Sequence, residues 1–210
     1  MDMSHPVTAV IPSLDGPVLE TLAGTTRPLS GRQVHRLCGV GSEAGVRNVL
    51  NRLVAHGLVD VTEAGGTHLY VLNREHLAAP AVESLSQLRA ALIERLRGEV
   101  SAWRLAPAQA SLFGSTARGD GDVHSDVDLL LVRADQTAED DELWQEQVSL
   151  LAEHVRRWTG NHAQIYDIDE SGLSDHIRAS EEIVQDWRRD AITLTGEELS
   201  QLIRRTGAVQ

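Results

Sequence analysis

The order of apolar and polar positions in the first third of the chain predicts three helices followed by a β-hairpin. Helical spacing covers residues 17–22, 30–39 and 42–57, with serine at the start of the second and third helices and glycine at their ends. Residues 58–62 and 67–72 then alternate as strands around a turn that contains two glycines.

The second and third of these helices each have an apolar side. In the second helix this side consists of Val34, Leu37 and Cys38. In the third helix it consists of Val46, Val49, Leu50, Leu53 and Val54. The outward side of the third helix carries Arg47, Asn48, Asn51 and Arg52. The pattern therefore predicts a small helical core with one polar helix face left exposed.

A longer helix is predicted between the two halves of the chain. Residues 81–103 have helical apolar spacing, Gly98 weakens the segment, and Pro107 ends it. Its first part fits a linker helix that pairs with a second copy of the chain, which would give a homodimer. Its later part fits a helix packed on the sheet that follows. A plain core helix explains the same spacing, and the sequence does not separate these interpretations.

Strand and helix patterns alternate in the second half of the chain. Strands are predicted at residues 110–113, 129–132, 163–168 and 191–196. Helices are predicted at residues 137–158 and 171–178. The expected fold class is α/β, of the α+β kind, with a small mixed sheet and a site at one edge of it.

Composition and charge narrow the classes of protein that fit. The hydrophobic content is 41% without a long apolar run, so no transmembrane helix and no membrane partner are expected. Residues 1–12 lack the features of a signal peptide. The single cysteine, Cys38, excludes an internal disulfide framework and favours a reducing cytoplasm. All 19 basic residues are arginine, which excludes a lysine-based mechanism.

Candidate chemistry lies between the strands at 110–113 and 129–132. A Gly114-Ser115 turn follows the first strand, and Asp126 and Asp128 stand on one face at the start of the second. Two adjacent carboxylates repel each other unless a cation lies between them, and their oxygens suit Mg²⁺. The glycine allows backbone N–H groups to approach an anion closely. The local pattern predicts a metal-bound polyphosphate beside a Gly-Ser turn.

Residues 112–132 resemble the motif of the minimal nucleotidyltransferases, which belong to the superfamily of DNA polymerase beta. The motif is Gly-Ser, then Arg-Gly, then Ser-Asp-x-Asp before an apolar strand, and it is matched by Gly114, Ser115, Arg118, Gly119, Ser125, Asp126 and Asp128. By this resemblance, Asp126 and Asp128 hold Mg²⁺ or Mn²⁺ and are the catalytic carboxylates. Gly114, Ser115, Arg118 and Ser125 bind the nucleoside triphosphate.

A third carboxylate is usual in that family on a neighbouring strand, and the match is weaker there. Aligning the apolar alternation puts Gln164 at this position, while Asp167 lies three residues later and on the opposite face. Two interpretations follow: the third carboxylate is missing, or a bulge lets Asp167 serve. The first needs no added assumption. Because Gln164 cannot act as a base at pH 7, this first interpretation predicts nucleotide binding with impaired turnover.

The amino-terminal pattern resembles a winged helix-turn-helix domain of the MarR/ArsR-like kind, between about residues 13 and 73. Residues 27–56 contain five arginines and one glutamate, a local charge of +4 in a chain of −12. By this resemblance the chain contacts double-stranded DNA, with Ser42, Arg47, Asn48 and Arg52 as the predicted DNA-binding residues. The alternative is a domain used for dimerisation or another protein contact, with its arginines as a solvated face.

The chain is thus expected to contain a winged helix-turn-helix domain at 13–76, a linker helix at 77–106 and a nucleotidyltransferase domain at 107–210. Two functions remain open from the sequence. One is transfer of a nucleoside monophosphate from an NTP to an acceptor hydroxyl. The other is transcriptional regulation by a DNA-binding protein whose second domain senses a nucleotide without turning it over. Minimal nucleotidyltransferases often act as antitoxins beside a small helical partner, usually without a winged domain.

Overall fold

The computed structural model describes residues 1–134 and 136–208, and these form two compact units. The amino-terminal unit consists of residues 4–89 with Asp2, and the carboxyl-terminal unit consists of the residues from Ala90 onward with Met1 and Met3. The two units are described separately below. The last two positions of the predicted domain at 107–210 lie outside the described residues.

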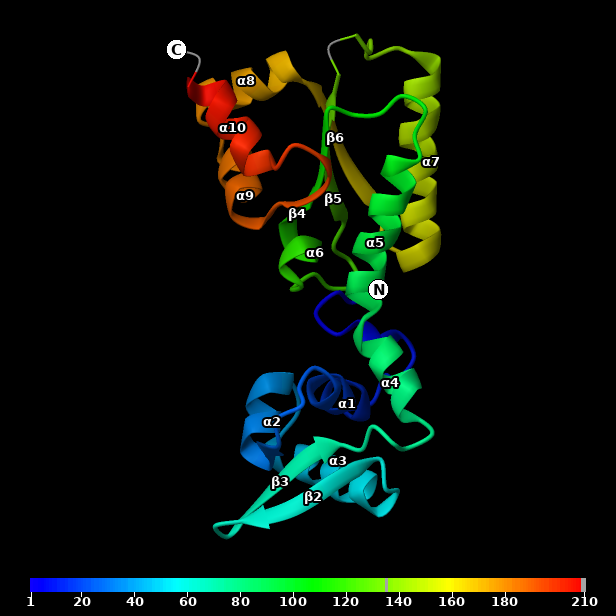
Figure 1. Cartoon of the computed structure of the whole chain (residues 1–210), viewed down its shortest axis with the longest axis vertical. Helices are drawn as coiled ribbons and strands as arrows, with labels where there is room; N and C mark the ends of the chain where they lie inside the picture. The colour runs from blue at the N-terminus through cyan, green and yellow to red at the C-terminus, as the bar shows by residue number, and fades with distance from the viewer. Residues whose placement is uncertain (135, 209–210) are drawn as a thin grey trace. The chain divides into compact units, whose positions relative to one another are not determined.

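The amino-terminal unit contains helices packed with a three-stranded antiparallel sheet of order β1-β3-β2 (Figure 1). Its elements are the 3-10 helix η1 (Pro6–Ala9), α1 (Asp15–Ala23), β1 (Leu29–Ser30), α2 (Gly31–Cys38), α3 (Glu43–Ala55), β2 (Val59–Ala64), β3 (Thr67–Leu72) and α4 (Ala79–Ser86). The predicted order of helices and hairpin is therefore present. The core is formed mainly by α1, α2, α3 and the hairpin, and Val18, Leu22, Val34, Leu50 and Tyr70 are among its buried residues.

Both predicted serine caps are present in this unit. The hydroxyl of Ser30 accepts a hydrogen bond from the backbone N–H of Gln33, and the Gln33 side chain accepts one from the backbone N–H of Ser30. The hydroxyl of Ser42 accepts a hydrogen bond from the backbone N–H of Gly45 at the start of α3. Each cap pairs a helix-end N–H that has no intrahelical partner, which fixes where the helix begins.

The carboxyl-terminal unit is a four-stranded mixed sheet of order β6-β5-β4-β7 with helices on both faces. Its elements are α5 (Leu88–Ser101), β4 (Gln109–Phe113), α6 (Gly114–Arg118), β5 (Val127–Arg133), α7 (Glu142–Thr159), β6 (Ala163–Asp169), α8 (Glu170–Ala179), α9 (Glu182–Asp190), β7 (Ile192–Gly196) and α10 (Leu199–Ala208). Strands β5 and β6 are parallel, and the other pairs are antiparallel. The predicted mixed α/β class is confirmed.

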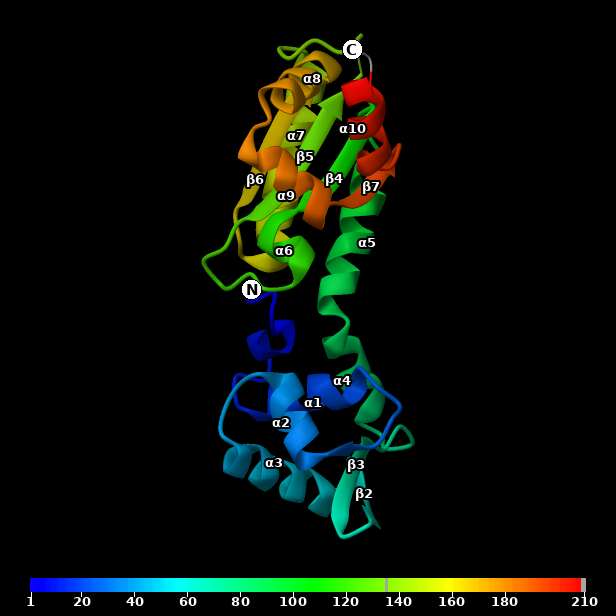
Figure 2. The ribbon, with the colours of Figure 1, turned by 90° about the vertical axis from the view of Figure 1, so that its left-hand side faces the viewer.

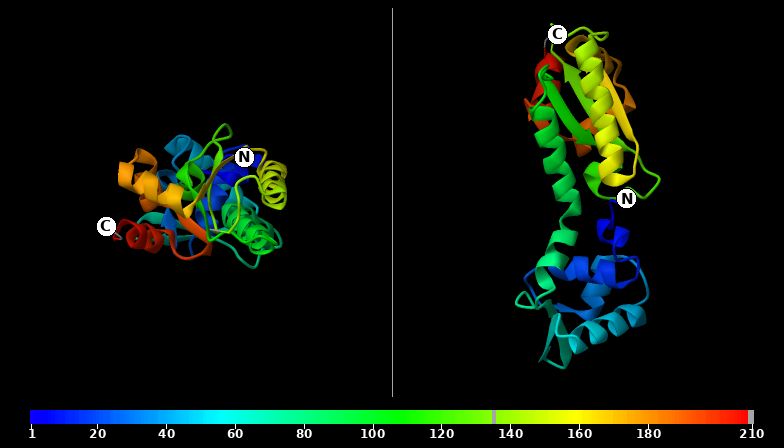
Figure 3. Two further views of the ribbon diagram at one scale, coloured as in Figure 1. Left: turned by 90° about the horizontal axis from the view of Figure 1, so that it is seen from above. Right: turned by 90° about the vertical axis from the view of Figure 1, so that its right-hand side faces the viewer.

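Alternate residues of the central strands fill two separate cores. Leu129 and Leu131 pack on the face that α5 and α7 cover, as the right-hand view of Figure 3 shows. Leu130 and Val132 pack on the other face, beneath α8, α9 and α10 (Figure 2). Every residue from Leu129 to Val132 is fully buried, so β5 lies between the two cores of the unit. This packing holds the residues at the start of the strand in defined positions.

Several details of the predicted elements are wrong. Leu37 is 58% exposed, because α2 turns only Val34 and Cys38 toward the core. The single helix predicted over 81–103 is interrupted at Gln87. The hydroxyls of Ser84 and Ser86, which precede the interruption, donate to the carbonyls of Pro80 and Glu83. Such bonds compete with the helical ladder and favour a break.

The predicted helix at 137–158 begins only at Glu142. Helix α9 was not predicted, and neither was α10. The buried side chains of α10, Leu199, Leu202 and Ile203, stand at i, i+3 and i+4, so the helical signal was present in the sequence. No helix among the described residues is both long enough and apolar enough to cross a membrane.

Candidate functional site

The predicted site lies where β4 ends, α6 begins and β5 starts. Phe113, the last residue of β4, is the antiparallel partner of Asp128, so the chain brings Gly114 directly against this carboxylate. A Cβ atom added at Gly114 would lie 2.1 Å from Oδ2 of Asp128, and the φ angle of Gly114 is +69°. A side chain here would displace the Asp128 carboxylate and would strain the left-handed backbone, so both effects favour glycine.

Asp128 carries a perturbed carboxyl group. It is half-buried at the start of β5, on the same face as Leu130 and Val132. Burial, reinforced by the negative charges of Asp126 and Asp186, raises the pKa of Asp128 to about 6, while the nearby positive charge of Arg118 lowers it. The site thus concentrates negative charge that a bound cation would stabilise.

The loop from Gly119 to Asp126 is held by a residue that the sequence reasoning missed. Asn161 is 3% exposed, and its Nδ2 donates to the carbonyl oxygens of Ser125 (2.8 Å) and Asp122 (3.3 Å). The hydroxyl of Ser125 donates to Oδ1 of Asp122 at 3.0 Å, so this predicted nucleotide-binding residue shapes the loop. The only sequence signal at Asn161 was its place in a Thr-Gly-Asn turn.

Ser115 packs against the same loop. A Cβ atom at Gly121 would lie 2.8 Å from the Ser115 hydroxyl oxygen, so this glycine leaves room for the serine side chain. The backbone carbonyl of Ser115 accepts from the N–H groups of Gly119 (2.9 Å) and Asp120 (3.0 Å). Helix α6 has only five residues, so its dipole adds little to anion binding.

Arg118, at the end of α6, is held by two carboxylates. Its Nε donates to Asp120 at 3.0 Å and its Nη1 donates to Asp190 of α9 at 2.6 Å. These hydrogen bonds, that to Asp120 first, raise the pKa of Arg118. Because 72 positions separate Arg118 from Asp190 and no local pattern links them, sequence reasoning could not find the second partner.

The register of β5 and β6 places Gln164 beside Asp128. Asp167 is the register partner of Leu131 instead and lies on the α7 side of the sheet. There its carboxylate accepts from Nη1 of Arg133 at 3.0 Å and from Nε1 of Trp144 at 2.8 Å. The bulge that would bring Asp167 to the site is absent from this strand pair as far as it is described. The partly buried Asp167 instead joins β6 to Arg133 of β5 and Trp144 of α7.

The donor set at the site consists of two carboxylates. Within residues 1–134 and 136–208, no group of three or more His, Cys, Asp or Glu side chains is arranged to hold a metal ion. A site with Asp126 and Asp128 alone still fits Mg²⁺, because this ion is commonly bound through one or two carboxylates and completed by phosphate oxygens and water.

The predicted DNA-binding residues lie on or beside α3. Arg47 and Asn48 are exposed, and Arg47 forms no ion pair among the described residues. Arg52 forms an ion pair with Asp15 of α1, so its positive charge is compensated within the unit. Ser42 is exposed, but its hydroxyl is used in capping α3.

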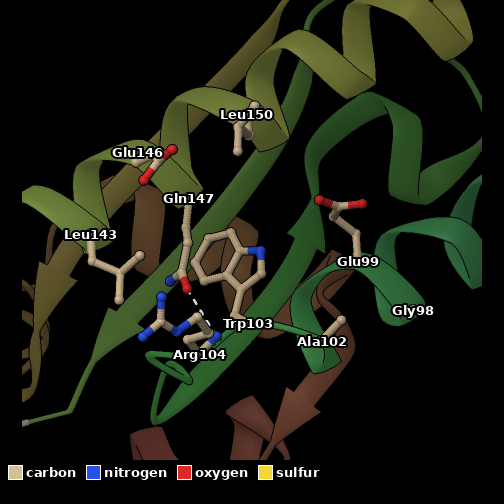
Figure 4. Close-up of a pocket in the computed structure, with 9 residues that line it drawn as sticks. All are labelled: Gly98, Glu99, Ala102, Trp103, Arg104, Leu143, Glu146, Gln147 and Leu150. Atoms are coloured by element: carbon tan, nitrogen blue, oxygen red, sulfur yellow. Dashed lines mark hydrogen bonds between the residues drawn. The ribbon is translucent and has the colours of Figure 1, made fainter.

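A cavity of about 400 Å³ lies between the end of α5 and α7 (Figure 4). These helices cover the face of the carboxyl-terminal sheet opposite to the one that carries Asp128. None of the predicted site residues lines the cavity. Gln147 in its wall accepts from the backbone N–H of Arg104 (2.9 Å) and donates to the carbonyl of Leu105 (3.1 Å). This glutamine joins the α5–β4 connection to α7, and the cavity is separate from the Gly114–Asp128 site.

Comparison with protein families found a match within the carboxyl-terminal unit. Residues 93–193 match the family model described as "Nucleotidyltransferase domain". This part of the carboxyl-terminal unit is therefore similar to a nucleotidyltransferase domain. The match includes Gly114, Ser115, Arg118, Asp126 and Asp128, and it leaves the amino-terminal unit unassigned. No curated protein matches the chain.

Two solved structures are similar to part of this chain. One is described as a toxin–antitoxin with AMP-PNP, with 17% identity and a TM-score of 0.35, and the other as a mutant of the toxin–antitoxin MntA-HpeT, with 15% identity and a TM-score of 0.34. Each comparison covers 57% of this chain and 84% of the other. Similarity at this level carries no argument about what this part of the chain binds.

Proposed function

We propose that residues 93–193 form a nucleotidyltransferase domain and that this domain binds a nucleoside triphosphate with Mg²⁺ beside Gly114, Asp126 and Asp128. The observation that carries this proposal is the close approach of Gly114 to the Asp128 carboxylate. It brings the turn after β4 beside Asp128, whose carboxylate is close enough to Asp126 to interact with its charge. An anion and its cation can be bound together at such a place.

In this proposal each side chain has a separate role. Asp126 and Asp128 hold the metal through their carboxylate oxygens, while Gly114, Ser115 and Arg118 contact the phosphates. Ser125 keeps the loop before Asp126 in shape through its bonds with Asp122. When bound, Mg²⁺ neutralises charge on the triphosphate and on the leaving pyrophosphate.

Replacing both carboxylates tests the binding site. Asp126→Ala combined with Asp128→Ala should abolish binding of Mg-NTP, measured by calorimetry. Asp175→Asn, which alters an exposed ion pair on α8, is the control and should bind as the wild type does. Unchanged affinity in the double variant would exclude this site.

The proposed reaction is transfer of a nucleoside monophosphate to an acceptor hydroxyl. The direct test is incubation with Mg²⁺ and each labelled NTP, with and without cell extract, followed by a search for labelled product. Label transfer that disappears in the double alanine variant would support the transferase.

A second candidate is a nucleotide sensor without turnover, and the position of Gln164 favours it. This neutral amide lies beside Asp128, where the third carboxylate of the family is expected, and it cannot accept the proton of an attacking hydroxyl. Nucleotide binding without any labelled product would support the sensor.

The amino-terminal unit is proposed to be a winged helix-turn-helix that binds double-stranded DNA. The local charge of +4 over residues 27–56 and the exposed Arg47 and Asn48 on α3 support this. Binding to genomic fragments, including the upstream region of the chain's own gene, should weaken as salt rises. Arg47→Ala should reduce the salt slope by about 1, whereas Arg178→Ala on α8 should not. Equal affinity for all DNA fragments at low salt would remove the support for a specific regulator.

A further inference from the structure

Helix α9 contacts both ends of the turn that contains Gly114. Its Trp187 is buried, and the indole meets the ring of Phe113 edge-on at a centroid distance of 6.2 Å. Phe113 directly precedes Gly114. At the other end of the turn, the carboxylate of Asp190 accepts a hydrogen bond from Nη1 of Arg118 at 2.6 Å. One helix therefore fixes the residue before the turn and the arginine after it.

Asp190 is a well-held partner for Arg118. Its side chain is only 3% exposed, because the guanidinium groups of Arg118 and Arg189 cover it. Arg189 donates to it from Nε and from Nη2, each at 2.8 Å, and also pairs with Asp186 one turn earlier at 2.6 Å. These hydrogen bonds, that of Arg189 first, lower the pKa of Asp190 and keep it ionised.

The other partner of Arg118 is much more accessible to solvent. The side chain of Asp120 is 60% exposed and accepts from Nε of Arg118 at 3.0 Å. A guanidinium has five N–H donors, and these two bonds use two of them. A phosphate can therefore bind Arg118 through the remaining donors, or by displacing the exposed Asp120, without breaking the bond to Asp190.

We propose that Asp190 is a positioning residue for the nucleotide site: it holds the guanidinium of Arg118 in the orientation that receives the phosphates. The proposal rests on the nucleotide binding proposed above. In the bound state the Arg118–Asp190 pair persists, whether the phosphate uses the remaining donors of Arg118 or displaces Asp120. Without Asp190, Arg118 would have to be ordered during binding, and that loss of side-chain entropy would weaken affinity.

The test compares nucleotide affinity in the full chain, with Mg-ATP and the other three Mg-NTPs as probes. Asp190→Asn should weaken binding about tenfold, the factor that corresponds to a hydrogen bond between charged groups. Asp190→Glu keeps the charge and should recover part of the loss. Asp175→Asn, which removes a carboxylate paired with Arg178 on α8, is the matched control and should change affinity less than about twofold.

A double-mutant cycle separates positioning from general support of the fold. In an Arg118→Ala background, Asp190→Asn should have no further effect on affinity, because the residue it positions is gone. A tenfold loss that persists in that background would overturn the proposal, and so would tighter binding by Asp190→Asn, which would make Asp190 a competitor of phosphate. Failure of the wild type to bind any Mg-NTP would instead refute the proposed function. If Asp190→Asn does not fold, Asp190→Glu in the same cycle decides the question.

Discussion

Replacing Gly114 by alanine, which adds only a methyl group, is the most direct test of the site. A methyl group there would meet Oδ2 of Asp128 at 2.1 Å and would also impose a side chain on a backbone with φ of +69°. Gly114→Ala should therefore abolish Mg-NTP binding and lower the free energy of unfolding by at least about 2 kcal/mol.

Gly160 provides the matched control for this prediction. It ends α7 with φ of +79°, but a Cβ atom there would meet nothing within 4 Å. Gly160→Ala should show only the backbone cost, about 1 kcal/mol, and retain nucleotide binding. Calorimetry and thermal unfolding measure both effects. If the two variants behave alike, the close contact with Asp128 has no role in binding.

The ionised carboxylate of Asp128 should lower the stability of the folded state when no metal is bound. Its pKa rises from the ordinary 3.8 to about 6 in the folded state, so the native state binds its proton more tightly than the unfolded state does. The bound proton therefore stabilises the folded state. This stabilisation is complete below the pKa of the unfolded state and is lost as the pH rises through about 6. Above that pH the carboxylate is ionised at a site that disfavours the charge.

Asp128→Asn should accordingly raise the free energy of unfolding at pH 7.5 without Mg²⁺. The expected gain is about 1 kcal/mol, reduced from the full value of the pKa shift because the half-buried group is partly screened by solvent. The gain should shrink as the pH falls from 6 to 4. Urea unfolding across this range measures it, with Asp60→Asn on the exposed side of β2 as the control. A gain that does not depend on pH would contradict the assigned cause.

At the scale of elements, the parallel pairing of β5 with β6 sets which residue lies beside Asp128. Gln164→Asp would place a third carboxylate there, opposite a like charge in the neighbouring strand. Without Mg²⁺ the variant should be less stable than the wild type by about 0.5 kcal/mol. With Mg²⁺ it should gain more in melting temperature than the wild type, because binding to the native state stabilises it.

The same variant tests the capacity for catalysis. Gln164→Asp supplies a base beside the acidic pair, so label transfer from NTP should appear or increase. Gln201→Asp adds the same charge at an exposed position of α10 and should change neither quantity. A melting temperature of Gln164→Asp that does not respond to Mg²⁺ would show that position 164 is not part of the metal site.

Local chemistry determined most of the elements that the sequence predicted. Ser30 and Ser42 cap helices through bonds within three residues, and Gly114 and Asp128 belong to one short motif. The break at Gln87 follows from competition between serine hydroxyls and the helix ladder, which spacing alone does not reveal. The Arg118–Asp190 pair and the Asn161 contacts depend on how distant segments pack, so no pattern along the chain could give them.

At the scale of the whole molecule, charge is distributed unevenly. The chain carries −12, whereas residues 27–56 carry +4, from Arg27, Arg32, Arg36, Arg47 and Arg52 against Glu43. Screening in salt confines the repulsion between distant acidic residues and a nucleic acid to about 10 Å. A basic segment in an acidic chain can therefore bind DNA at short range, and the remaining charge opposes non-specific association.

Coupling between the two ligands separates a sensor from an enzyme that merely carries a DNA-binding unit. If the chain is a sensor, Mg-NTP must change its affinity for DNA, and DNA must change its affinity for Mg-NTP by the same factor. We expect a factor of at least about 5, the lower end of typical allosteric coupling. Measuring DNA binding with and without Mg-NTP, and nucleotide binding with and without DNA, gives the two factors independently.

The double variant Asp126→Ala with Asp128→Ala should bind DNA as tightly as the nucleotide-free wild type and show no response to Mg-NTP. Two factors equal to 1 would exclude the sensor, and two unequal factors would mean that the measurements do not describe one binding equilibrium.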